Sequence, residues 1–197
     1  MRSSGSTRSP RPDAPVRLYI VLAGEDHPKA CTGRRLLHRG LAREVRSALG
    51  LSPPPVVLDP YASEPLGPAD GALAARGGIL AIDCSWNRLT ERGRFPGPVV
   101  EERGIHRRLP ILIATNPHHY GRPAQLNTVE ALAAALFLVG HRAESARILE
   151  GFRGSDAFLR VNADRLAAYS LEHDPDGIRA AERRLFGGVL SAQSTGG

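Results

Sequence analysis

Hydrophobic residues gather in short runs through the first part of the chain, and each run has the length of a buried strand. Runs of this kind, rich in β-branched and aromatic residues, are typical of strands that are covered on both faces. They predict strands at 17–23, 56–58, 79–84 and 109–114. Between the first two strands, residues 34–49 have apolar positions near helical spacing and arginines on the other face, which predicts an amphipathic helix. Residues 70–76 suit one or two helical turns.

The periodicity becomes helical after residue 127. Asn127 is followed three residues later by Glu130, which resembles a capping box, and the apolar run behind it predicts a buried helix. Further helices are predicted at 142–151, 155–170 and 178–186. Strands early and helices late predict an α/β layer joined to a helical lobe.

Composition narrows the class of protein. The chain has 197 residues, of which 42% are hydrophobic, and this suits one domain or one domain with a small appendage. No apolar run approaches the roughly 20 residues of a membrane span, and the start lacks the apolar stretch of a secretory signal. With only Cys31 and Cys84, we expect a cytoplasmic protein with reduced thiols.

Several kinds of site are absent from the sequence. Neither a GxGxxG fingerprint nor a Walker loop occurs, which argues against the usual dinucleotide and P-loop classes. CxxC and HExxH are also missing, so we expect no metal site. A Ser or Cys nucleophile with a His base stays open, although nothing like GxSxG supports it.

The charge is basic and unevenly distributed. The chain has 26 basic and 20 acidic residues, a net charge of +6. Up to Arg108 there are 17 basic and 11 acidic residues, whereas the remainder has nine of each. Positive charge gathered in one part suits a polyanionic partner, with RNA the first candidate, and a solvated basic surface is the alternative.

Three segments carry candidate chemistry. In 26–36, Thr32 and Gly33 precede a predicted helix, a place that suits a carboxylate or phosphate, unless Thr32 is an ordinary N-cap. In 81–87, Asp83 and Trp86 follow the carboxyl end of a strand, where open α/β sheets bind ligands; a capping Asp83 and a core Trp86 are the alternative.

The third segment is a long polar loop after the predicted strand 109–114. It contains His118 and His119 and leads to the capped helix. Loops at the carboxyl ends of strands often carry function, although a mere connection is also possible. Leu58 and Asp59, after the second strand, would add a fourth wall to a ligand site.

Six motifs resemble one family when they are taken in order. They are CTGRRL, LDPYASEPLGPAD, IDCSWN, LPILIATNPHHYGRP, LNTVEALAAALFLVG and FLRVN. From about Leu18 to Tyr169, the chain resembles the ribosomal small-subunit rRNA aminocarboxypropyltransferases.

The resemblance implies a function and a fold. The function is transfer of the 3-amino-3-carboxypropyl group of S-adenosylmethionine to N3 of a modified uridine or pseudouridine in small-subunit rRNA, with release of methylthioadenosine. The fold is SPOUT-like α/β with a deep trefoil knot and a helical C-terminal lobe. We therefore expect a disordered basic tail (1–15), an α/β cofactor-binding part (16–108), a knot-forming strand with the helical lobe (109–186) and a flexible tail (187–197).

The resemblance also implies site residues. It places Thr32 by the methionine part of the cofactor, Ile82 and Leu109 at the adenosine, Leu58 at the adenine and Trp86 near the sulfonium. The full set of implied cofactor contacts is Thr32, Leu58, Ile82, Trp86, Leu109, Ala124 and Thr128. Relatives often have an aromatic residue where this chain has Ala124, and NPVNYG where it has NPHHYG.

Two further groups complete the expected site. Asp83 is the carboxylate best placed to take the proton of N3. A basic face for RNA, in small-subunit rRNA or a pre-ribosomal subunit, would contain Arg34, Arg35, Arg39, Arg103, Arg107 and Arg108. We expect a monomer without membrane contact. The alternatives are a SPOUT-like RNA methyltransferase and a non-catalytic RNA-binding assembly factor.

Overall fold

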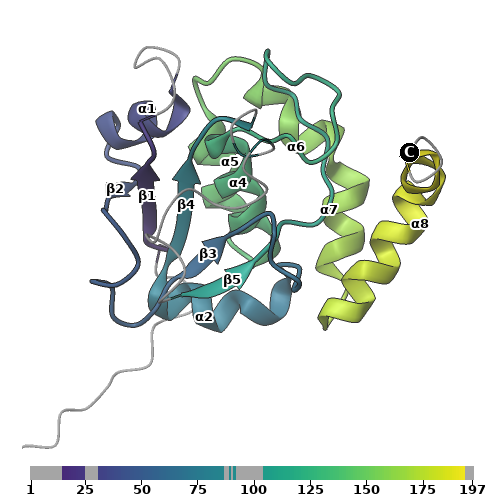
Figure 1. The fold of residues 1–197 in the computed structure, drawn as a ribbon, viewed down its shortest axis with the longest axis horizontal. Coiled ribbons are helices and arrows are strands. Elements are labelled where there is room, and N and C mark those ends of the chain that lie inside the picture. The colour runs from purple at the N-terminus through teal and green to yellow at the C-terminus, as the bar shows by residue number, and fades with distance from the viewer. Residues whose placement is uncertain (1–14, 25–30, 87–88, 90, 92–103, 194–197) are drawn as a thin grey trace, which may run out of the picture.

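The computed structural model describes residues 15–24, 31–86, 89, 91 and 104–193 (Figure 1). Within these residues, five strands form one sheet in the order β2-β1-β4-β3-β5, and every strand pair is parallel. The strands are β1 (Leu18–Leu22), β2 (Arg43–Glu44), β3 (Val56–Leu58), β4 (Ile79–Asp83) and β5 (Ile105–Arg107). Their carboxyl ends therefore point to one edge of the sheet.

Helices connect and cover these strands. The first part contains α1 (Thr32–His38), η1 (Pro68–Asp70) and α2 (Gly71–Gly77). The second part contains α4 (Thr128–Leu138), α5 (Arg142–Leu149), η2 (Ser155–Ala157), α6 (Phe158–Val161), α7 (Ala163–Ser170) and α8 (Pro175–Gln193). Figure 1 shows α7 and α8 side by side beyond the β5 end of the sheet.

Both faces of the sheet are buried, as the continuous apolar runs predict. In β1, Ile20 belongs to the main core with α4, whereas Tyr19 and Val21 belong to a second cluster on the other face. In β4 the same alternation puts Ile79 in the main core and Leu80 in the second cluster. The main core continues through α4 into the helical lobe, so the sheet and the lobe share one hydrophobic interior.

The predicted helix 34–49 is wrong beyond its first turns. Gly40 has φ +65°, its N–H donates to the carbonyl of Leu37, and the N–H of Leu41 donates to the carbonyl of Leu36. This left-handed glycine ends the helix, because the backbone turns away after it. The chain then forms β2, and the N–H of Val45 bonds to the carbonyl of Ile20 in β1.

The predicted strand 109–114 is also wrong. The N–H of Ile111 donates to Glu182 at 3.0 Å, and the N–H of Ile113 donates to Asn162 at 2.8 Å. The Tyr169 hydroxyl donates to the carbonyl of Ile111 at 2.9 Å. Side chains of the helical lobe thus bond to the backbone of Ile111 and Ile113. The backbone of Leu112 and Ala114 bonds instead to residues 121–124 around a single antiparallel bridge. The segment therefore does not join the sheet, whose last strand among the described residues is β5.

Two of the predicted helices have other bounds. Residues 155–170 form η2, α6 and α7, with the break at Asn162, whose side chain bonds to the backbone of Ile113. The last helix begins at Pro175, as proline at a first helical turn allows, and continues to Gln193, past the expected end at Phe186. The helix after Asn127 and its capping box are confirmed.

Two expectations concern the ends of the chain and membranes. Most of the predicted tail 1–15 lies outside the described residues, as do residues 194–197. Across the part of the chain that the structure describes, no helix is both long enough and apolar enough to cross a bilayer.

Candidate active site

A cavity of about 940 Å³ opens where strands β3 and β4 end. Leu58 ends β3, and Ile82 and Asp83 end β4; the helix α4 supplies the opposite wall through Thr128 and Ala131. This is the place where open parallel sheets bind ligands, because the connections diverge there. The volume falls in the range of small-molecule and cofactor sites.

The seven residues expected at the cofactor all line this one cavity. Their positions span nearly 100 residues of chain, and the fold brings them together. They are Thr32, Leu58, Ile82, Trp86, Leu109, Ala124 and Thr128.

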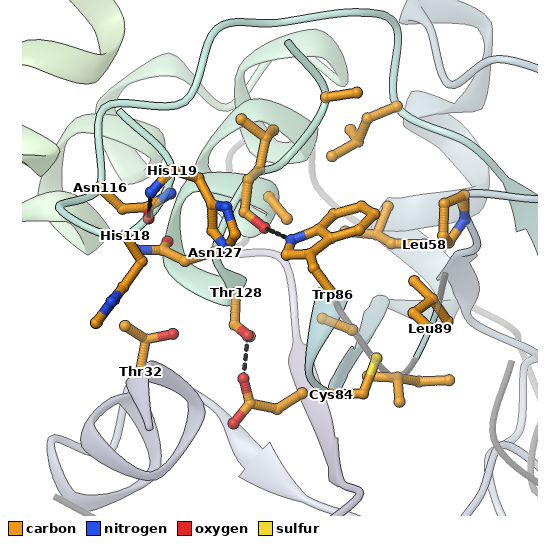
Figure 2. Close-up of a pocket in the computed structure, with 18 of the residues that line it drawn as sticks. Thr32, Leu58, Cys84, Trp86, Leu89, Asn116, His118, His119, Asn127 and Thr128 are labelled. Carbon is orange, nitrogen blue, oxygen red and sulfur yellow. Dashed lines mark hydrogen bonds between the residues drawn. The ribbon is translucent and has the colours of Figure 1, made fainter. Parts of the chain in front are cut away.

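Asp83 lines the cavity and connects two further elements to the end of β4. It is 7% exposed and accepts a hydrogen bond from the Cys31 thiol at 2.6 Å and another from the Thr128 hydroxyl (Figure 2). A Cβ on Gly33 would lie 2.7 Å from Asp83 Oδ2, so only glycine lets α1 approach this carboxylate. The carboxylate thereby holds the starts of α1 and α4 against the end of β4.

The start of α1 differs from the expected N-cap. Cys31 is the N-cap residue and accepts from the N–H of Arg34 at 3.3 Å, whereas Thr32 is the first helical residue and lines the cavity. Burial and the hydrogen bond to Asp83 raise the pKa of the Cys31 thiol from 9.0 to about 12. The thiol therefore stays protonated and serves as a donor.

Trp86 forms a wall of the cavity. Its indole Nε1–H donates to the carbonyl of Leu126 at 2.7 Å, which fixes the plane of the ring (Figure 2). The side chain is only partly buried and lines the cavity, so the pocket interpretation fits better than the alternative of a core tryptophan.

Glu130 holds two walls of the cavity together. Its carboxylate is fully buried and accepts from the N–H and hydroxyl of Thr115, both at 2.8 Å. It also accepts from the Asn116 side chain at 2.7 Å and from the N–H of Asn127 at 3.0 Å. The capping box predicted the bond to Asn127, but no local sequence signal indicated Thr115 or Asn116.

The loop after Asn116 contributes two histidines. His118 and His119 both line the cavity, and Figure 2 shows the His118 ring directed toward Thr32. His119 Nδ1 is shielded from solvent and has no hydrogen-bond partner among the described residues. Ala124 lines the same cavity with φ +61°, a conformation that costs free energy in a residue with a Cβ.

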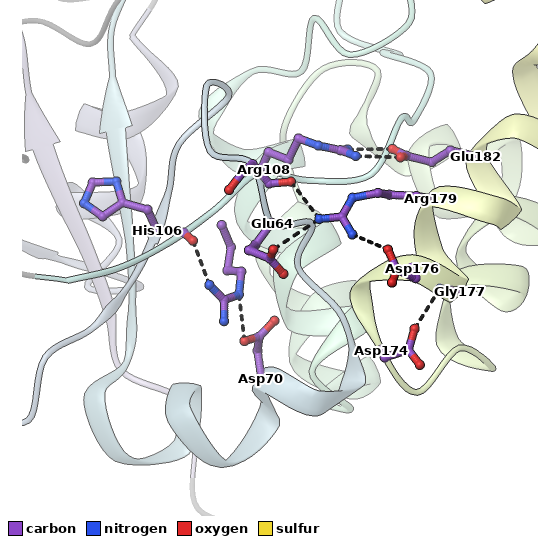
Figure 3. A network of polar contacts seen from close by, with 11 residues as sticks. Glu64, Asp70, His106, Arg108, Asp174, Asp176, Gly177, Arg179 and Glu182 are labelled. Carbon is purple, nitrogen blue, oxygen red and sulfur yellow. Dashed lines mark hydrogen bonds and ion pairs between the residues drawn. The ribbon is translucent and has the colours of Figure 1, made fainter.

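The arginines predicted to form one RNA-binding face differ in their positions and partners. Arg35 and Arg108 line the cavity, whereas Arg34 is exposed outside it and Arg39 lies on α1's end. Arg107 pairs with Asp70 at 3.0 Å, and Arg108 pairs with Glu182 through two bonds of 2.7 Å (Figure 3). Arg103 lies outside the described residues. Arg153 lines the cavity and was not predicted.

The donor side chains of the described residues are spread too widely for a metal site. Among the described residues, no group of three or more His, Cys, Asp or Glu side chains could hold a metal ion. Residues 16–48 match a model described as a possible Fer4-like domain in RNase L inhibitor. This stretch contains a single cysteine, Cys31, and an iron–sulfur cluster needs several thiolates, so its residues do not fit a cluster.

A family model and the curated relatives of this chain indicate the same family. Residues 56–186 match the model of the ribosome biogenesis protein, C-terminal, family. The 16S rRNA aminocarboxypropyltransferase of Methanopyrus kandleri is 41% identical over 86% of this chain and 99% of that protein. The 18S rRNA aminocarboxypropyltransferase of Schizosaccharomyces pombe is 34% identical over 92% of this chain and 60% of that protein.

A solved structure agrees with this comparison. The SAM-dependent rRNA:acp-transferase Tsr3 from Vulcanisaeta distributa matches with a TM-score of 0.74 and 35% identity, over 87% of this chain and 89% of that one. The resemblance noted in the motifs is thus confirmed along most of the sequence. The chain belongs to the ribosome biogenesis family whose curated members are named small-subunit rRNA aminocarboxypropyltransferases.

Proposed function

We propose that this protein transfers the 3-amino-3-carboxypropyl group of S-adenosylmethionine to N3 of a uridine or pseudouridine in small-subunit rRNA and releases methylthioadenosine. One observation carries the proposal. In a chain of this family, a single cavity at the carboxyl ends of the strands is lined by every residue that the motifs assign to the cofactor.

The lining fits S-adenosylmethionine chemically. Leu58, Ile82, Leu109 and the indole of Trp86 provide apolar surface for an adenosine. Hydroxyl and amide groups of the walls, together with the carboxylate of Asp83, provide donors and acceptors for a charged amino-acid arm. A cavity of about 940 Å³ leaves room for a nucleobase beside the cofactor.

The geometry of binding selects the product. S-adenosylmethionine has three electrophilic carbons on its sulfur, and the one presented to the acceptor at about 3–3.5 Å and in line reacts. Transfer of the amino-acid arm requires that the methyl group be covered and the methylene exposed. The ring of Trp86, fixed by its bond to Leu126, is the rigid apolar surface that would cover the methyl. N3 loses its proton to solvent water and bonds to the methylene, the carbon–sulfur bond breaks, and its electron pair stays on the leaving thioether, which becomes neutral.

Asp83 has two possible roles in this reaction. We predicted it as the acceptor of the N3 proton, and it lines the cavity. The thiol of Cys31 and the hydroxyl of Thr128 already donate to its two oxygens, so both oxygens are engaged with the starts of α1 and α4. We therefore propose that Asp83 mainly positions Thr128 and the start of α1.

We also propose the SPOUT-like description of the fold, with a trefoil knot that includes the segment after Arg108. The support is the course of residues 109–113, which bond to the later residues Asn162, Tyr169 and Glu182 and do not join the sheet. The division at residue 108 into a cofactor-binding part and a helical lobe is proposed on the same ground. A crystal structure would test the knot. The two chain ends are joined by a mathematical closure, and simplifying the backbone path then shows whether the chain is knotted.

The products of the reaction test the function. Purified protein, S-adenosylmethionine and a small-subunit rRNA fragment should give methylthioadenosine and an RNA heavier by one aminocarboxypropyl group, detected by mass spectrometry. S-adenosylhomocysteine with a methylated RNA would indicate a methyltransferase and refute the proposal. RNA binding without either product would indicate a non-catalytic assembly factor.

A further inference from the structure

The two ring nitrogens of His119 have different surroundings. Nδ1 is shielded from solvent and has no hydrogen-bond partner among the described residues. Nε2 also has no partner within that part of the chain, but it is not shielded, and the side chain lines the cavity. Shielded polar atoms without a partner are rare in folded proteins, so the surroundings of this ring point to a function rather than to packing alone.

The shielded Nδ1 decides which nitrogen carries the proton of the neutral ring. One ring nitrogen of a neutral histidine is a donor and the other is an acceptor. A shielded N–H without an acceptor is rarer in proteins than a shielded lone pair without a donor. We therefore assign the proton to Nε2, so that the accessible edge of the His119 ring carries an N–H donor.

The backbone around His119 is held by hydrogen bonds on both sides. Its N–H donates to the carbonyl of Asn116 at 3.2 Å and to the side-chain oxygen of Asn116 at 3.1 Å, and its carbonyl accepts from the N–H of Arg122 at 2.9 Å. The side-chain amide of Asn116 donates in turn to the buried carboxylate of Glu130 at 2.7 Å. The turn is therefore tied to α4, and the ring is positioned before any ligand binds.

His119 belongs to the part of the cavity wall that an acceptor would reach first. Its neighbours His118 and Tyr120 are exposed, and Tyr120 is 70% exposed. In the view of Figure 2, Trp86 lies between His119 and Leu58, the residue proposed for the adenine. This position suits contact with the acceptor base rather than with the adenosine.

We propose that His119 is a catalytic residue, whose Nε2–H donates a hydrogen bond to a carbonyl oxygen beside N3 of the acceptor base, O2 or O4. The proposal rests on the proposed function, which supplies the base and the reaction. When N3 loses its proton to solvent water, the negative charge spreads over N3 and these two oxygens. A donor already aimed at one of the oxygens stabilises the anion. N3 then bonds to the methylene, the electron pair of the carbon–sulfur bond stays on the thioether, and His119 keeps its proton throughout.

Two variants separate a donor from a base. His119→Phe keeps an aromatic ring without the donor, and His119→Asn keeps an N–H donor but does not take up a proton. In single-turnover assays with saturating S-adenosylmethionine and rRNA fragment, we expect His119→Phe to be slower by about 10²-fold and His119→Asn to stay within about tenfold of the unchanged protein. The affinities for S-adenosylmethionine, by calorimetry, and for the rRNA fragment, by fluorescence, should change less than twofold, because the donor acts mainly on the anion.

A more acidic acceptor gives a sharper expectation. In an rRNA fragment made with 5-fluorouridine in place of uridine, the fluorine withdraws electrons and makes the N3–H more acidic. The anion then needs less stabilisation, so the loss of rate caused by His119→Phe should be several-fold smaller with this RNA. Equal losses with both RNAs would show that His119 does not act on the N3 anion and would overturn the proposal.

The tautomer of His119 can be measured without turnover. Long-range ¹⁵N–¹H correlation spectra of the labelled protein report which ring nitrogen carries the proton, and the His119 signals are those that disappear in His119→Asn. We expect the proton on Nε2 in the free protein. A neutral ring with its proton on Nδ1 would overturn the proposal, because the accessible nitrogen would then be an acceptor.

His173→Phe is the matched control. His173 is exposed and does not line the cavity, so the same exchange of side chains should leave the rate and both affinities within twofold of the unchanged protein. Thermal unfolding of each variant checks that it folds.

Three further outcomes would overturn the proposal. An unchanged rate in folded His119→Phe would remove His119 from the reaction, and a His119→Asn protein as slow as His119→Phe would indicate a base. A loss of affinity for S-adenosylmethionine in proportion to the loss of rate would assign His119 to the cofactor. The products formed by the unchanged protein test the proposed function separately, so a failure of that function is distinguishable from a failure of His119 as the donor.

Discussion

At the scale of single residues, the site is organised around the carboxylate of Asp83, which accepts hydrogen bonds from two distant parts of the chain. Asp83 could be predicted as a functional residue, because a carboxylate after a buried strand is typical of a ligand site. Its partners could not, since Cys31 and Thr128 lie 52 and 45 residues away along the chain. The same holds for Gly33, which appears in the sequence as a loop glycine and is required by its approach to Asp83.

The variant Asp83→Asn distinguishes the two proposed roles of Asp83, a catalytic base and a positioning residue. A positioning role predicts a lower melting temperature, weaker binding of S-adenosylmethionine, and a loss of turnover proportionate to the lost binding, because the amide cannot accept from both partners. A base role predicts an intact cofactor affinity with turnover lower by roughly 10²–10⁴-fold. Calorimetry and single-turnover assays on an rRNA fragment distinguish the two, and full activity in the folded variant would eliminate the base.

Cys31 should make the free energy of unfolding depend on pH in the alkaline range. Because the pKa of its thiol rises from 9.0 to about 12 on folding, the folded protein retains a proton that the unfolded chain loses. The stabilisation that this retained proton gives the folded state is complete below pH 9 and is lost as the pH rises from 9 toward 12. The melting temperature of the unchanged protein should therefore fall more steeply over this window than that of Cys31→Ala. Parallel curves for the two proteins would contradict the assignment.

At the scale of elements, the sequence predicts what local patterns determine. The buried runs of β1, β3 and β4 and the capped helix α4 lie within a residue or two of their predicted bounds. The errors come from tertiary contacts. Residues 109–114 have a strand's composition, yet Glu182 and Asn162 supply hydrogen-bond partners from a distant lobe. The helix after Thr32 ends early because Gly40 adopts a left-handed conformation, for which the apolar spacing gives no signal.

Glu130 is the connection between α4 and the loop that forms one wall of the cavity. Glu130→Ala leaves the donors of Thr115, Asn116 and Asn127 without their acceptor, and we expect a loss of about 3 kcal/mol or more in the free energy of unfolding. Glu130→Gln keeps one acceptor oxygen and should lose less. Denaturant titration measures both values.

An exposed glutamate directly after the neighbouring helix provides the control for Glu130. Glu150 is the exposed C-cap residue of α5, so Glu150→Ala should change the free energy of unfolding by less than about 0.5 kcal/mol. A Glu130→Ala protein as stable as Glu150→Ala would show that water replaces the buried carboxylate.

At the scale of the whole molecule, the net charge of +6 gives an incomplete account of the surface. Counting residues predicts a basic N-terminal part, but counting cannot show which charges are paired. Arg107 and Arg108 belong to the excess, yet Asp70 and Glu182 compensate them (Figure 3). The uncompensated arginines at the cavity are Arg35, from the basic part, and Arg153, from the part with no net charge.

The pair of Arg108 and Glu182 fastens α8 to the sheet. Its charges are largely buried, so Arg108→Met should destabilise the protein by about 3–5 kcal/mol, because Glu182 is left without a counter-charge. The double variant Arg108→Met/Glu182→Gln should recover part of this loss, since Gln still accepts from the N–H of Ile111. Urea unfolding of the three proteins measures the coupling; additive losses would mean that the ion pair contributes nothing of its own.

The path of residues 109–113 also sets the order in which the molecule can be completed during synthesis. Leu109 and Ile111 line the cavity, but the partners of this backbone are Asn162, Tyr169 and Glu182, which are made 49 to 71 residues later. When the sheet and α4 have left the ribosome, residues 109–113 therefore still lack the side chains that support them as one wall of the pocket. Contacts of such long range form slowly and late. Helix α8 thus supplies, through Glu182, the final support of a site whose lining residues, from Thr32 to Arg153, were all made at least 29 residues earlier.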